Sequence, residues 1–294
     1  PAGLAAGLLR TARPRQWVKN LLVFAAPGAA GVLLHASVLR RSALAFVIFC
    51  VAASGTYFLN DAADAESDRR HPAKRSRPVA AGAVPRARAG TVAALLLGAA
   101  LVASPLALGR GFAICVTIYV AINLAYSFGG KREPVLDLVA VASGFLIRAV
   151  AGGMAVRVPL SDWFLIVAAF GSLLVVAGKR EADLTQAPSP GAVGNGGPAP
   201  AAYTRAYLRF VRFLAAAVTI TAYCLWAFAK ARTGTTELLF ELSIVPFVMA
   251  ILRYNLLVEN GRGGAPEEVL LGDWRTLAMG AAWLALFAAA VHGR

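Results

Sequence analysis

Residues 42–60 read SALAFVIFCVAASGTYFLN, an unbroken apolar run without Asp, Glu, Lys or Arg. An α-helix needs roughly 20 such residues to cross the hydrocarbon core of a bilayer, which is about 30 Å thick. Similar runs recur along the chain, and they are continuously apolar rather than alternating, which argues against a barrel. They cover residues 17–35, 42–60, 89–109, 111–130, 136–156, 161–178, 211–229, 239–257 and 275–292. The sequence therefore predicts an all-α integral membrane protein with nine transmembrane helices.

The composition of the whole chain agrees with this fold class. Its 294 residues are 59% hydrophobic and only 15% charged, with a mean hydropathy of +0.66, well outside the usual range for a soluble domain. We expect a single transmembrane catalytic domain over residues 1–294, with a flexible loop at about 185–202, where Pro, Gly and Ala prevail. Cys50, Cys115 and Cys224 lie inside apolar runs without CxxC spacing, so neither a disulfide nor a zinc site is expected.

The net charge of +14 has a topological explanation. Threading nine spans through a membrane puts most of the 29 Lys and Arg residues on one face, together with the long loops at 61–88 and 179–210. By the positive-inside tendency this face is cytoplasmic, so we expect the N-terminus inside, the C-terminus outside and the active site facing the cytoplasm. Nucleic-acid binding is not expected. An N-terminal signal peptide is an alternative, because arginines at 10–15 precede the first apolar run.

An acid cluster follows the run at 42–60: residues 60–78 read NDAADAESDRRHPAKRSRP. If the helix continues past the membrane surface, Asp61, Asp64 and Asp68 share one face and Glu66 points to the opposite side. Converging carboxylates repel one another unless a cation neutralises them. Hard oxygen ligands suit Mg²⁺, which binds through carboxylates together with a substrate's phosphates. The three aspartates are therefore the expected metal ligands and catalytic residues.

A basic rim follows the acids. It consists of Arg69, Arg70, His71, Lys74, Arg75 and Arg77. A metal site beside such a rim suits a polyphosphate, because the metal bridges its oxygens while the bases neutralise the remaining charge. The alternative is a solvated loop in which these acids and bases simply pair. The helical spacing of the aspartates at the end of an apolar run favours the phosphate site.

A second polar cluster, GKREADL at 178–184, follows the sixth expected span. On a helix Lys179 and Asp183 share a face, while Glu181 points away. One carboxylate flanked by bases suits phosphate capture better than a second full metal site. The alternative is an ordinary surface ion pair, worth a few tenths of a kcal/mol.

Other polar side chains lie where hydrocarbon would penalise them. A charge inside a membrane helix costs about 2.5–3.5 kcal/mol on insertion scales, so it usually faces a partner or a wet cavity. Arg148 is the most informative, because Asp137 lies too far along the same helix to pair with it. Arg205, Arg209 and Arg212 recur at helical spacing and form either one basic stripe or an interfacial collar. Further residues of this kind are Lys19, Asn20, Asn123, Tyr126 and Lys131.

These motifs resemble the UbiA superfamily of intramembrane prenyltransferases. The resemblance rests on NDAADAESD at 60–68, the nine-span layout and the second polar cluster after the sixth span. In that family two acid-rich loops hold Mg²⁺ and a diphosphate above a bundle of nine helices. The resemblance therefore implies a nine-helix bundle with a cytoplasmic-side active-site cavity. Further stretches resemble a phosphoribosyltransferase branch of the superfamily that acts on decaprenyl phosphate. They are RPRQWVKN (13–20), NLAYSFGGKREPVLDL (123–138), GFLIRAVAGG (144–153) and LRYNLLVENGRGGAPEEVLLGD (252–273).

The branch implies transfer of 5-phosphoribosyl from phosphoribosyl pyrophosphate to a polyprenyl phosphate, with release of pyrophosphate, to make a precursor of cell-wall arabinan. It also implies Mg²⁺ as the cofactor. Because the acceptor phosphate already carries about −1.5 to −2 charges at neutral pH, we expect positioning and electrostatics rather than a general base. The expected substrate-binding residues are Lys19, Asn60, His71, Lys74, Arg77, Asn123, Tyr126, Lys131, Arg148, Lys179, Arg180, Asp183, Arg205, Arg209 and Arg212.

The second cluster departs from the superfamily's pattern. Ordinary members carry a second Asp-rich motif where this chain has Lys179 and Arg180, which argues against a prenyl diphosphate donor. Position 183 is Asp where we expect Glu in this branch, so the role of Asp183 stays open. Two other functions are considered: a prenyltransferase with an aromatic acceptor, which would carry acids at both clusters, and a transporter, which would spread charges along a path through the spans.

Overall fold

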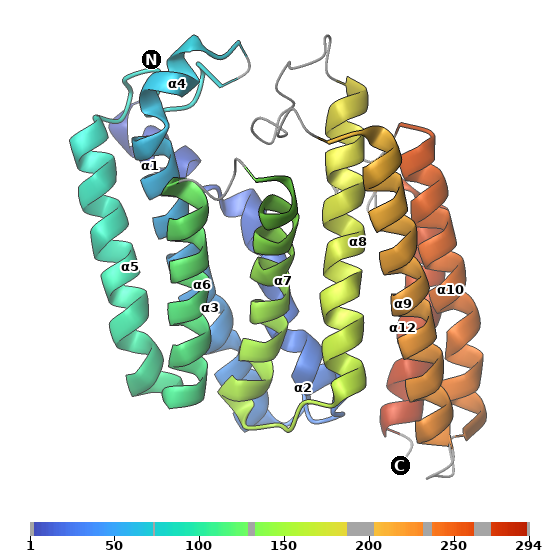
Figure 1. The fold of residues 1–294 in the computed structure, drawn as a ribbon. Helices are drawn as coiled ribbons and strands as arrows, with labels where there is room; N and C mark the ends of the chain where they lie inside the picture. Colours follow the sequence, from blue (N-terminus) through green and yellow to red (C-terminus); the bar gives the residue numbers. More distant parts are fainter. Residues whose placement is uncertain are drawn as a thin grey trace. The chain divides into compact units, whose positions relative to one another are not determined.

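The computed structural model of the chain describes residues 3–72, 74–128, 133–186, 203–231, 237–261 and 272–292. These residues form helices joined by turns, and no strand occurs among them (Figure 1). The elements are α1 (Leu4–Ala12), the 3₁₀ helix η1 (Pro14–Phe24), α2 (Ala25–Ala29), α3 (Ala36–Ala63), α4 (Ala65–Arg70), α5 (Arg86–Leu108), α6 (Arg110–Phe128), α7 (Pro134–Val156), α8 (Asp162–Gln186), α9 (Arg205–Ala231), α10 (Glu237–Glu259) and α12 (Trp274–His292).

Within the described residues, eight helices are long and apolar enough to cross a membrane. They are α3, α5, α6, α7, α8, α9, α10 and α12, and they account for every expected span except the first. The protein is therefore an integral membrane protein. The first expected span, at 17–35, is not a single α-helix, because it is divided between η1 and the short α2. Pro27 and Gly28, both weak helix formers, lie within α2 and limit its length.

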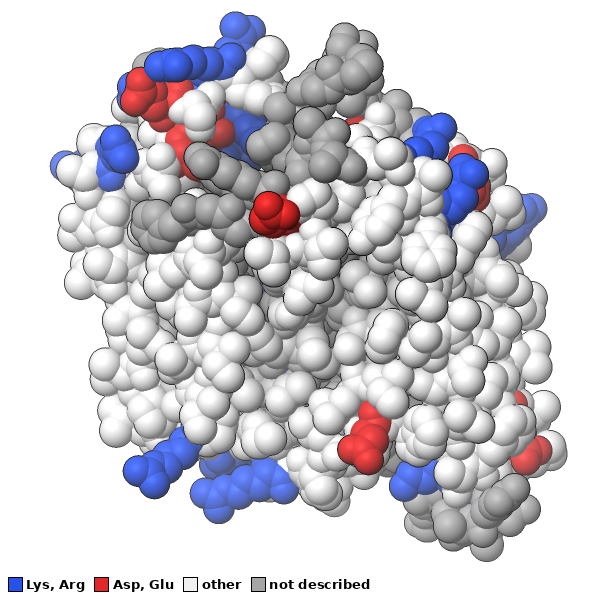
Figure 2. All heavy atoms as spheres, viewed as in Figure 1, with Lys and Arg blue, Asp and Glu red and all other residues white. Residues whose placement is uncertain are grey.

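The chain divides into two compact units, each with its own core. Unit 1 comprises residues 1–28, 32–131 and 147–159, and unit 2 comprises residues 29–31, 132–146 and 160–294. On the face shown in Figure 2, most Lys, Arg, Asp and Glu side chains lie toward the ends of the helices, and the surface between them is mostly uncharged. Large apolar side chains such as Leu95, Leu106 and Phe210 are exposed. An apolar outer face of this kind is what contact with lipid tails requires.

The core of unit 1 is centred on Phe49 of α3. The Phe49 ring meets Phe112 and Tyr119 of α6 edge-on, with ring centroids 5.8 Å and 5.4 Å away. Gly152 of α7 lies against the backbone of η1, since a Cβ added at this glycine would stand 1.9 Å from the Val23 carbonyl oxygen. Only glycine permits so close an approach. The packing therefore fixes the end of α7 beside η1.

In unit 2, α8 packs along α9, and α10 packs along both α9 and α12. Tyr223 stacks on Phe247 at a centroid distance of 4.0 Å and accepts a hydrogen bond of 2.8 Å from Trp283 Nε1. Gly178 of α8 brings that helix close to α10, because a Cβ at this position would lie 2.5 Å from the Tyr254 hydroxyl oxygen. This close contact lies at the first residue of the second polar cluster, so the packing of α8 against α10 fixes the backbone where the cluster begins.

Candidate active site

The second-span helix ends before the acid cluster is complete. α3 stops at Ala63, and Asp64 follows with φ −89° and ψ 2°. The short helix α4 begins at Ala65, and the Ser67 hydroxyl donates to the Asp64 carbonyl oxygen at 2.9 Å. Local hydrogen bonds of this kind compete with helix continuation. The expectation that one continuous helix carries Asp61, Asp64 and Asp68 is therefore wrong.

Two of the aspartates nevertheless converge on one guanidinium. Arg77 Nη1 lies 2.8 Å from Oδ2 of Asp68 and 3.6 Å from Oδ1 of Asp61. Both carboxylates are buried, and burying a carboxylate is strongly unfavourable unless it is paired. Arg77 therefore neutralises two acids from different helices. The pairing resembles the alternative in which acids and bases of this stretch pair, but these two carboxylates are buried and do not lie in a solvated loop.

Arg13 belongs to this cluster, and the sequence did not predict it. Its Nη2 donates to Asp61 Oδ1 at 2.6 Å, and its guanidinium lies over the Tyr57 ring, 4.9 Å from the centroid. Its backbone adopts φ 52° and ψ 59° between α1 and η1, a left-handed conformation uncommon for residues other than glycine. Arg13 and Asp61 are 48 positions apart, so no local spacing could have revealed the contact.

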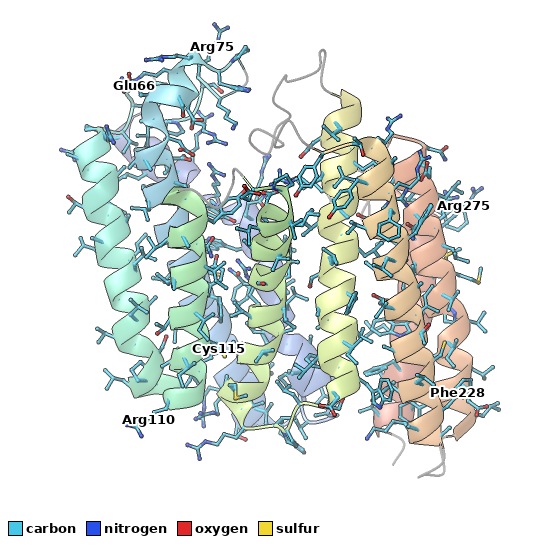
Figure 3. All side chains as sticks on the ribbon, in the orientation of Figure 1. Glu66, Arg75, Arg110, Cys115, Phe228 and Arg275 are labelled. Carbon is cyan, nitrogen blue, oxygen red and sulfur yellow. The ribbon has the colours of Figure 1, made fainter. Side chains whose placement is uncertain are left out.

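Other side chains at this end of unit 1 lie around the cluster. Glu66 is exposed and pairs with Arg70 at 2.9 Å, so it points away from the aspartates as expected. Figure 3 labels Glu66 on α4 and Arg75 in the turn that follows it, among many polar side chains. The side-chain oxygen of Asn60 accepts a hydrogen bond from the Ser127 hydroxyl, which ties the end of α3 to the end of α6. Asp64 is half-buried.

Unit 2 has its own charged cluster near the end of α8. Arg180 donates two hydrogen bonds to Asp137, from Nε at 2.9 Å and from Nη2 at 2.6 Å. The Tyr203 hydroxyl donates to the Pro134 carbonyl oxygen and lies 3.5 Å from Asp137 Oδ2. Burial, and after it the nearby Asp137 carboxylate, raise the pKa of Tyr203 above its ordinary value. The hydroxyl therefore keeps its proton and remains a donor.

Asp183 has an unsatisfied oxygen in this cluster. Its Oδ2 is buried and makes no hydrogen bond among the described residues, although Arg180 Nη1 lies 3.9 Å away. A buried acceptor without a donor is unfavourable by about 1–3 kcal/mol. Lys179, one turn earlier on α8, is half-buried. Asp183 thus offers an acceptor that a ligand could satisfy, beside two cationic side chains.

The arginines of α9 do not form the single exposed stripe that was one of the two expectations. Arg212 is fully buried, donates to Glu181 Oε2 at 2.8 Å, and also binds Glu259 and Asn255. Arg209 is partly exposed and contacts Glu259 at 2.9 Å. The reason is burial: Arg212 faces α8 and α10, where only paired charges are tolerated.

Arg148 lies inside unit 1, where polar side chains surround its guanidinium. Its Nε donates to Asn20 Oδ1 at 2.7 Å, and its Nη2 donates to the Tyr119 hydroxyl at 2.9 Å. Asn20 in turn donates to Cys50 Sγ at 3.2 Å. Asn123 donates to the Tyr119 carbonyl of its own helix at 2.8 Å. Of the polar residues expected in the first, fourth and fifth spans, Asn20 is therefore bonded directly to Arg148, and Asn123 is linked to Arg148 through Tyr119.

Comparison with known proteins identifies the family. Residues 21–269 match the UbiA prenyltransferase family. The chain is a member of the UbiA family. Its curated relatives include the decaprenyl-phosphate phosphoribosyltransferase of Mycolicibacterium smegmatis, which is 46% identical over 99% of this chain and 94% of the relative. The protein of the same name from Corynebacterium glutamicum is 43% identical over 99% of this chain and 89% of the relative.

The UbiA fold is also found among solved structures. A UbiA homologue from Archaeoglobus fulgidus, solved bound to GPP and Mg²⁺, superposes with a TM-score of 0.74 over 98% of this chain and the whole of that chain. The two sequences are only 18% identical, so this likeness concerns the fold alone. The resemblance inferred from NDAADAESD and the apolar runs is therefore confirmed at the level of the family and of the all-helical fold.

The donor set of unit 1 fits a divalent cation in its chemistry. Asp61 and Asp68 contribute hard carboxylate oxygens that already hold a cationic group between them, and Asp64 lies in the turn that separates them. Mg²⁺ prefers such ligands. Among the described residues, however, no three His, Cys, Asp or Glu side chains are arranged to hold a metal.

The remaining expected site residues are distributed as follows. Lys19, Lys74, His71 and Tyr126 are half-buried in unit 1, and Arg205 is exposed at the start of α9. The Lys74 amide donates to the His71 carbonyl oxygen at 3.1 Å, within the turn that leads to Arg77. Lys131 and most of the loop expected at 185–202 lie outside the described residues.

Proposed function

We propose that the protein transfers 5-phosphoribosyl from phosphoribosyl pyrophosphate to decaprenyl phosphate, or a similar polyprenyl phosphate, and releases pyrophosphate. The observation that carries the proposal is 43–46% identity, over nearly the whole chain, to curated proteins named decaprenyl-phosphate phosphoribosyltransferase. Both substrates are anionic, and one is a lipid, which suits a membrane protein with charged clusters at its helix ends. The product would serve as a precursor of cell-wall arabinan. The whole chain, residues 1–294, would act as one catalytic domain.

We assign the leaving pyrophosphate to the three aspartates and to two bases that follow them, Lys74 and Arg77. Asp61, Asp64 and Asp68 would hold Mg²⁺, which when bound supplies positive charge to the departing diphosphate. Arg77 and Lys74 would bind phosphate oxygens beside it, since guanidinium and ammonium groups balance phosphate charge. Asn60, held by Ser127, would fix the position of the α3 end. No side chain needs to remove a proton from the acceptor, because its phosphate is already ionised.

The other expected residues receive more specific assignments from their contacts. Arg180 donates two hydrogen bonds to Asp137, and Arg212 donates to Glu181, so both charges are already balanced. Lys179 is therefore the stronger candidate for a substrate phosphate in unit 2. Asp183 would accept a hydrogen bond from a hydroxyl group of the sugar. Arg148, His71, Lys19, Lys131, Asn123, Tyr126, Arg205 and Arg209 remain candidates to bind phosphates or orient the substrates.

We also propose nine membrane crossings with the active site at the cytoplasmic side, the N-terminus inside and the C-terminus outside. The combined length of η1 and α2 supports a ninth membrane crossing at the start of the chain. The 11 residues of η1 at about 2.0 Å each and the 5 residues of α2 at about 1.5 Å each extend roughly 30 Å, the thickness of the hydrocarbon core. The excess of Lys and Arg near the acid cluster supports the cytoplasmic side.

A transfer assay tests the function. Purified protein would be incubated with phosphoribosyl pyrophosphate and decaprenyl phosphate, with Mg²⁺ or with EDTA, and the lipids separated by mass spectrometry. We expect lipid-linked phosphoribose only with the metal, and Asp64→Ala should abolish it without unfolding the protein. A parallel incubation with a prenyl diphosphate and an aromatic acceptor addresses the alternative prenyltransferase. A prenylated aromatic without lipid-linked phosphoribose would refute the proposal, and movement of substrate across vesicles without turnover would indicate a transporter.

A further inference from the structure

Two arginines from distant parts of the chain neutralise the buried aspartates of unit 1. Arg77 contacts both Asp61 and Asp68, and Arg13 donates to Asp61 at 2.6 Å. The aspartate side chains are 2% and 4% exposed, whereas those of Arg13 and Arg77 are 30% and 24% exposed. The acids are thus fixed inside the protein, while their counter-ions reach the surface. A partly hydrated counter-ion can be exchanged at a lower desolvation penalty than a buried one.

A metal ion and these arginines compete for the same oxygen atoms. Arg13 Nη2 and Arg77 Nη1 both approach Oδ1 of Asp61, and Arg77 also occupies Oδ2 of Asp68. A divalent cation bound to either carboxylate would repel a guanidinium at these distances. A metal that binds these two oxygens without another ligand therefore displaces the arginines from their partners. A diphosphate that arrives with the metal offers the displaced guanidinium groups new oxygen partners in bidentate geometry.

We infer that Arg13 and Arg77 are exchangeable counter-ions of Asp61 and Asp68 that move onto the donor's diphosphate when the metal binds. Metal and diphosphate then bind as a coupled pair, because each removes the penalty that the other would meet alone. The inference rests on the proposed function in taking a diphosphate as the ligand. It assigns a binding role to Arg13, which joins α1 to η1 and is kept over the Tyr57 ring.

The neighbouring bases differ in ways that supply a control. Arg70 lies on α4 close to Asp68 in sequence, but it pairs with exposed Glu66, and both side chains are more than two-thirds exposed, at 80% and 73%. Arg70→Gln therefore removes one positive charge from α4, the helix that carries Asp68, without touching the buried aspartates. Arg77→Lys keeps the charge but loses the planar fork. These variants separate a specific exchange from a general change in surface potential.

The experiment measures metal binding directly. Mn²⁺ would replace Mg²⁺, and free Mn²⁺ would be counted by electron paramagnetic resonance with full-length protein in nanodiscs, with and without pyrophosphate. The Mn²⁺–pyrophosphate complex formed without protein would be subtracted. For the unchanged protein we expect pyrophosphate to tighten Mn²⁺ binding on the order of tenfold or more, within the usual range of coupling between sites. Arg77→Gln and Arg13→Gln should each bind Mn²⁺ alone several-fold tighter and show a coupling at least threefold smaller. Arg70→Gln should change neither quantity.

The outcomes are distinct. If Arg77→Gln and Arg13→Gln bind Mn²⁺ no tighter than the unchanged protein and keep its coupling, the inference is overturned. Equal effects of Arg70→Gln would also overturn it, since they would indicate surface potential alone. If Arg77→Gln does not fold, as judged by its thermal transition, Arg13→Gln and Arg77→Lys carry the test, with Arg77→Lys expected to bind Mn²⁺ alone no tighter than the unchanged protein. Intact coupling without phosphoribosyl transfer would refute the proposed function while leaving the exchange supported.

Discussion

The buried ion pairs around Asp61 and Asp68 in unit 1 and around Arg212 in unit 2 differ in which partner is exposed to water. In unit 1 the acids Asp61 and Asp68 are buried and the arginines that balance them are partly exposed. In unit 2 the arginine itself is buried: Arg212 has no exposed side-chain surface and is held by Glu181 of α8. A fully desolvated pair is costly to separate, whereas a half-exposed partner can return to water. The difference indicates that the unit 1 cluster can exchange its cations and that the Arg212 cluster holds helices together.

Asp61→Asn should produce the largest change in activity. Removing one carboxylate from the cation site is expected to lower the transfer rate by about 10³-fold, of the order seen when preorganised charge stabilisation is lost. The thermal transition should shift little, because partly exposed Arg13 and Arg77 can regain water. A radiolabel transfer assay and a melting curve check both quantities. Glu66→Gln, an exposed acid on α4, is the matched control and should behave like the unchanged protein. Equal losses for both variants would contradict the comparison.

Arg212→Met should give the largest change in stability. The substitution removes the arginine that lies 2.8 Å from buried Glu181, while Arg209 still lies 3.7 Å away, and removing one partner of a buried ion pair typically costs about 3–5 kcal/mol. The measurement is denaturant unfolding in detergent, together with the transfer rate per folded molecule, which should stay within a few-fold of the original. Adding Glu181→Gln to Arg212→Met should recover part of the loss, because the stranded charge is removed. A stable Arg212→Met protein that has lost transfer would assign Arg212 to the substrate instead.

Asp183→Asn tests whether an acid in unit 2 binds substrate or stabilises the fold. The buried Oδ2 of Asp183 makes no hydrogen bond among the described residues, so the carboxylate contributes little to folding. We expect unchanged or slightly higher stability and a KM for phosphoribosyl pyrophosphate that rises about tenfold, the equivalent of one hydrogen bond. Steady-state kinetics and melting curves provide both numbers. A loss of stability with an unchanged KM would show that Asp183 is structural.

The smallest effect is expected for Asp273, the residue directly before α12 in unit 2. Arg253 donates to Asp273 at 3.0 Å and 2.8 Å, and these hydrogen bonds, with those from Thr276, hold the pKa of Asp273 below its ordinary range. A lowered folded-state pKa contributes stability above the unfolded value, about 3.9, and that stability disappears as the pH falls through the folded value. Asp273→Asn should therefore melt slightly earlier than the unchanged protein at neutral pH, and the gap should close in acid. A gap independent of pH would contradict the assignment.

The charged sites were only partly predictable from the sequence. The acid cluster, its position at the end of an apolar run and the outward direction of Glu66 all follow from local spacing. The break in the helix at Asp64 does not follow from local spacing. The Ser67 hydrogen bond and the turn into α4 interrupt a helix that the spacing of the aspartates predicts to continue. Arg13 lies 48 positions from Asp61, so only folding brings them together. Arg212 has a spacing typical of an exposed stripe, and its burial depends on where α8 and α10 pack.

By itself the sequence determined that the chain is helical, lies in a membrane and belongs to the UbiA family, because hydrophobic run length and the NDAADAESD motif are local properties. The tertiary structure decided which charge meets which: Arg77 between Asp61 and Asp68, Arg180 on Asp137, and Arg212 on Glu181. The physical reason is that the transfer of apolar residues into lipid depends on each segment separately. The pairing of buried charges depends on distances between segments far apart in the chain.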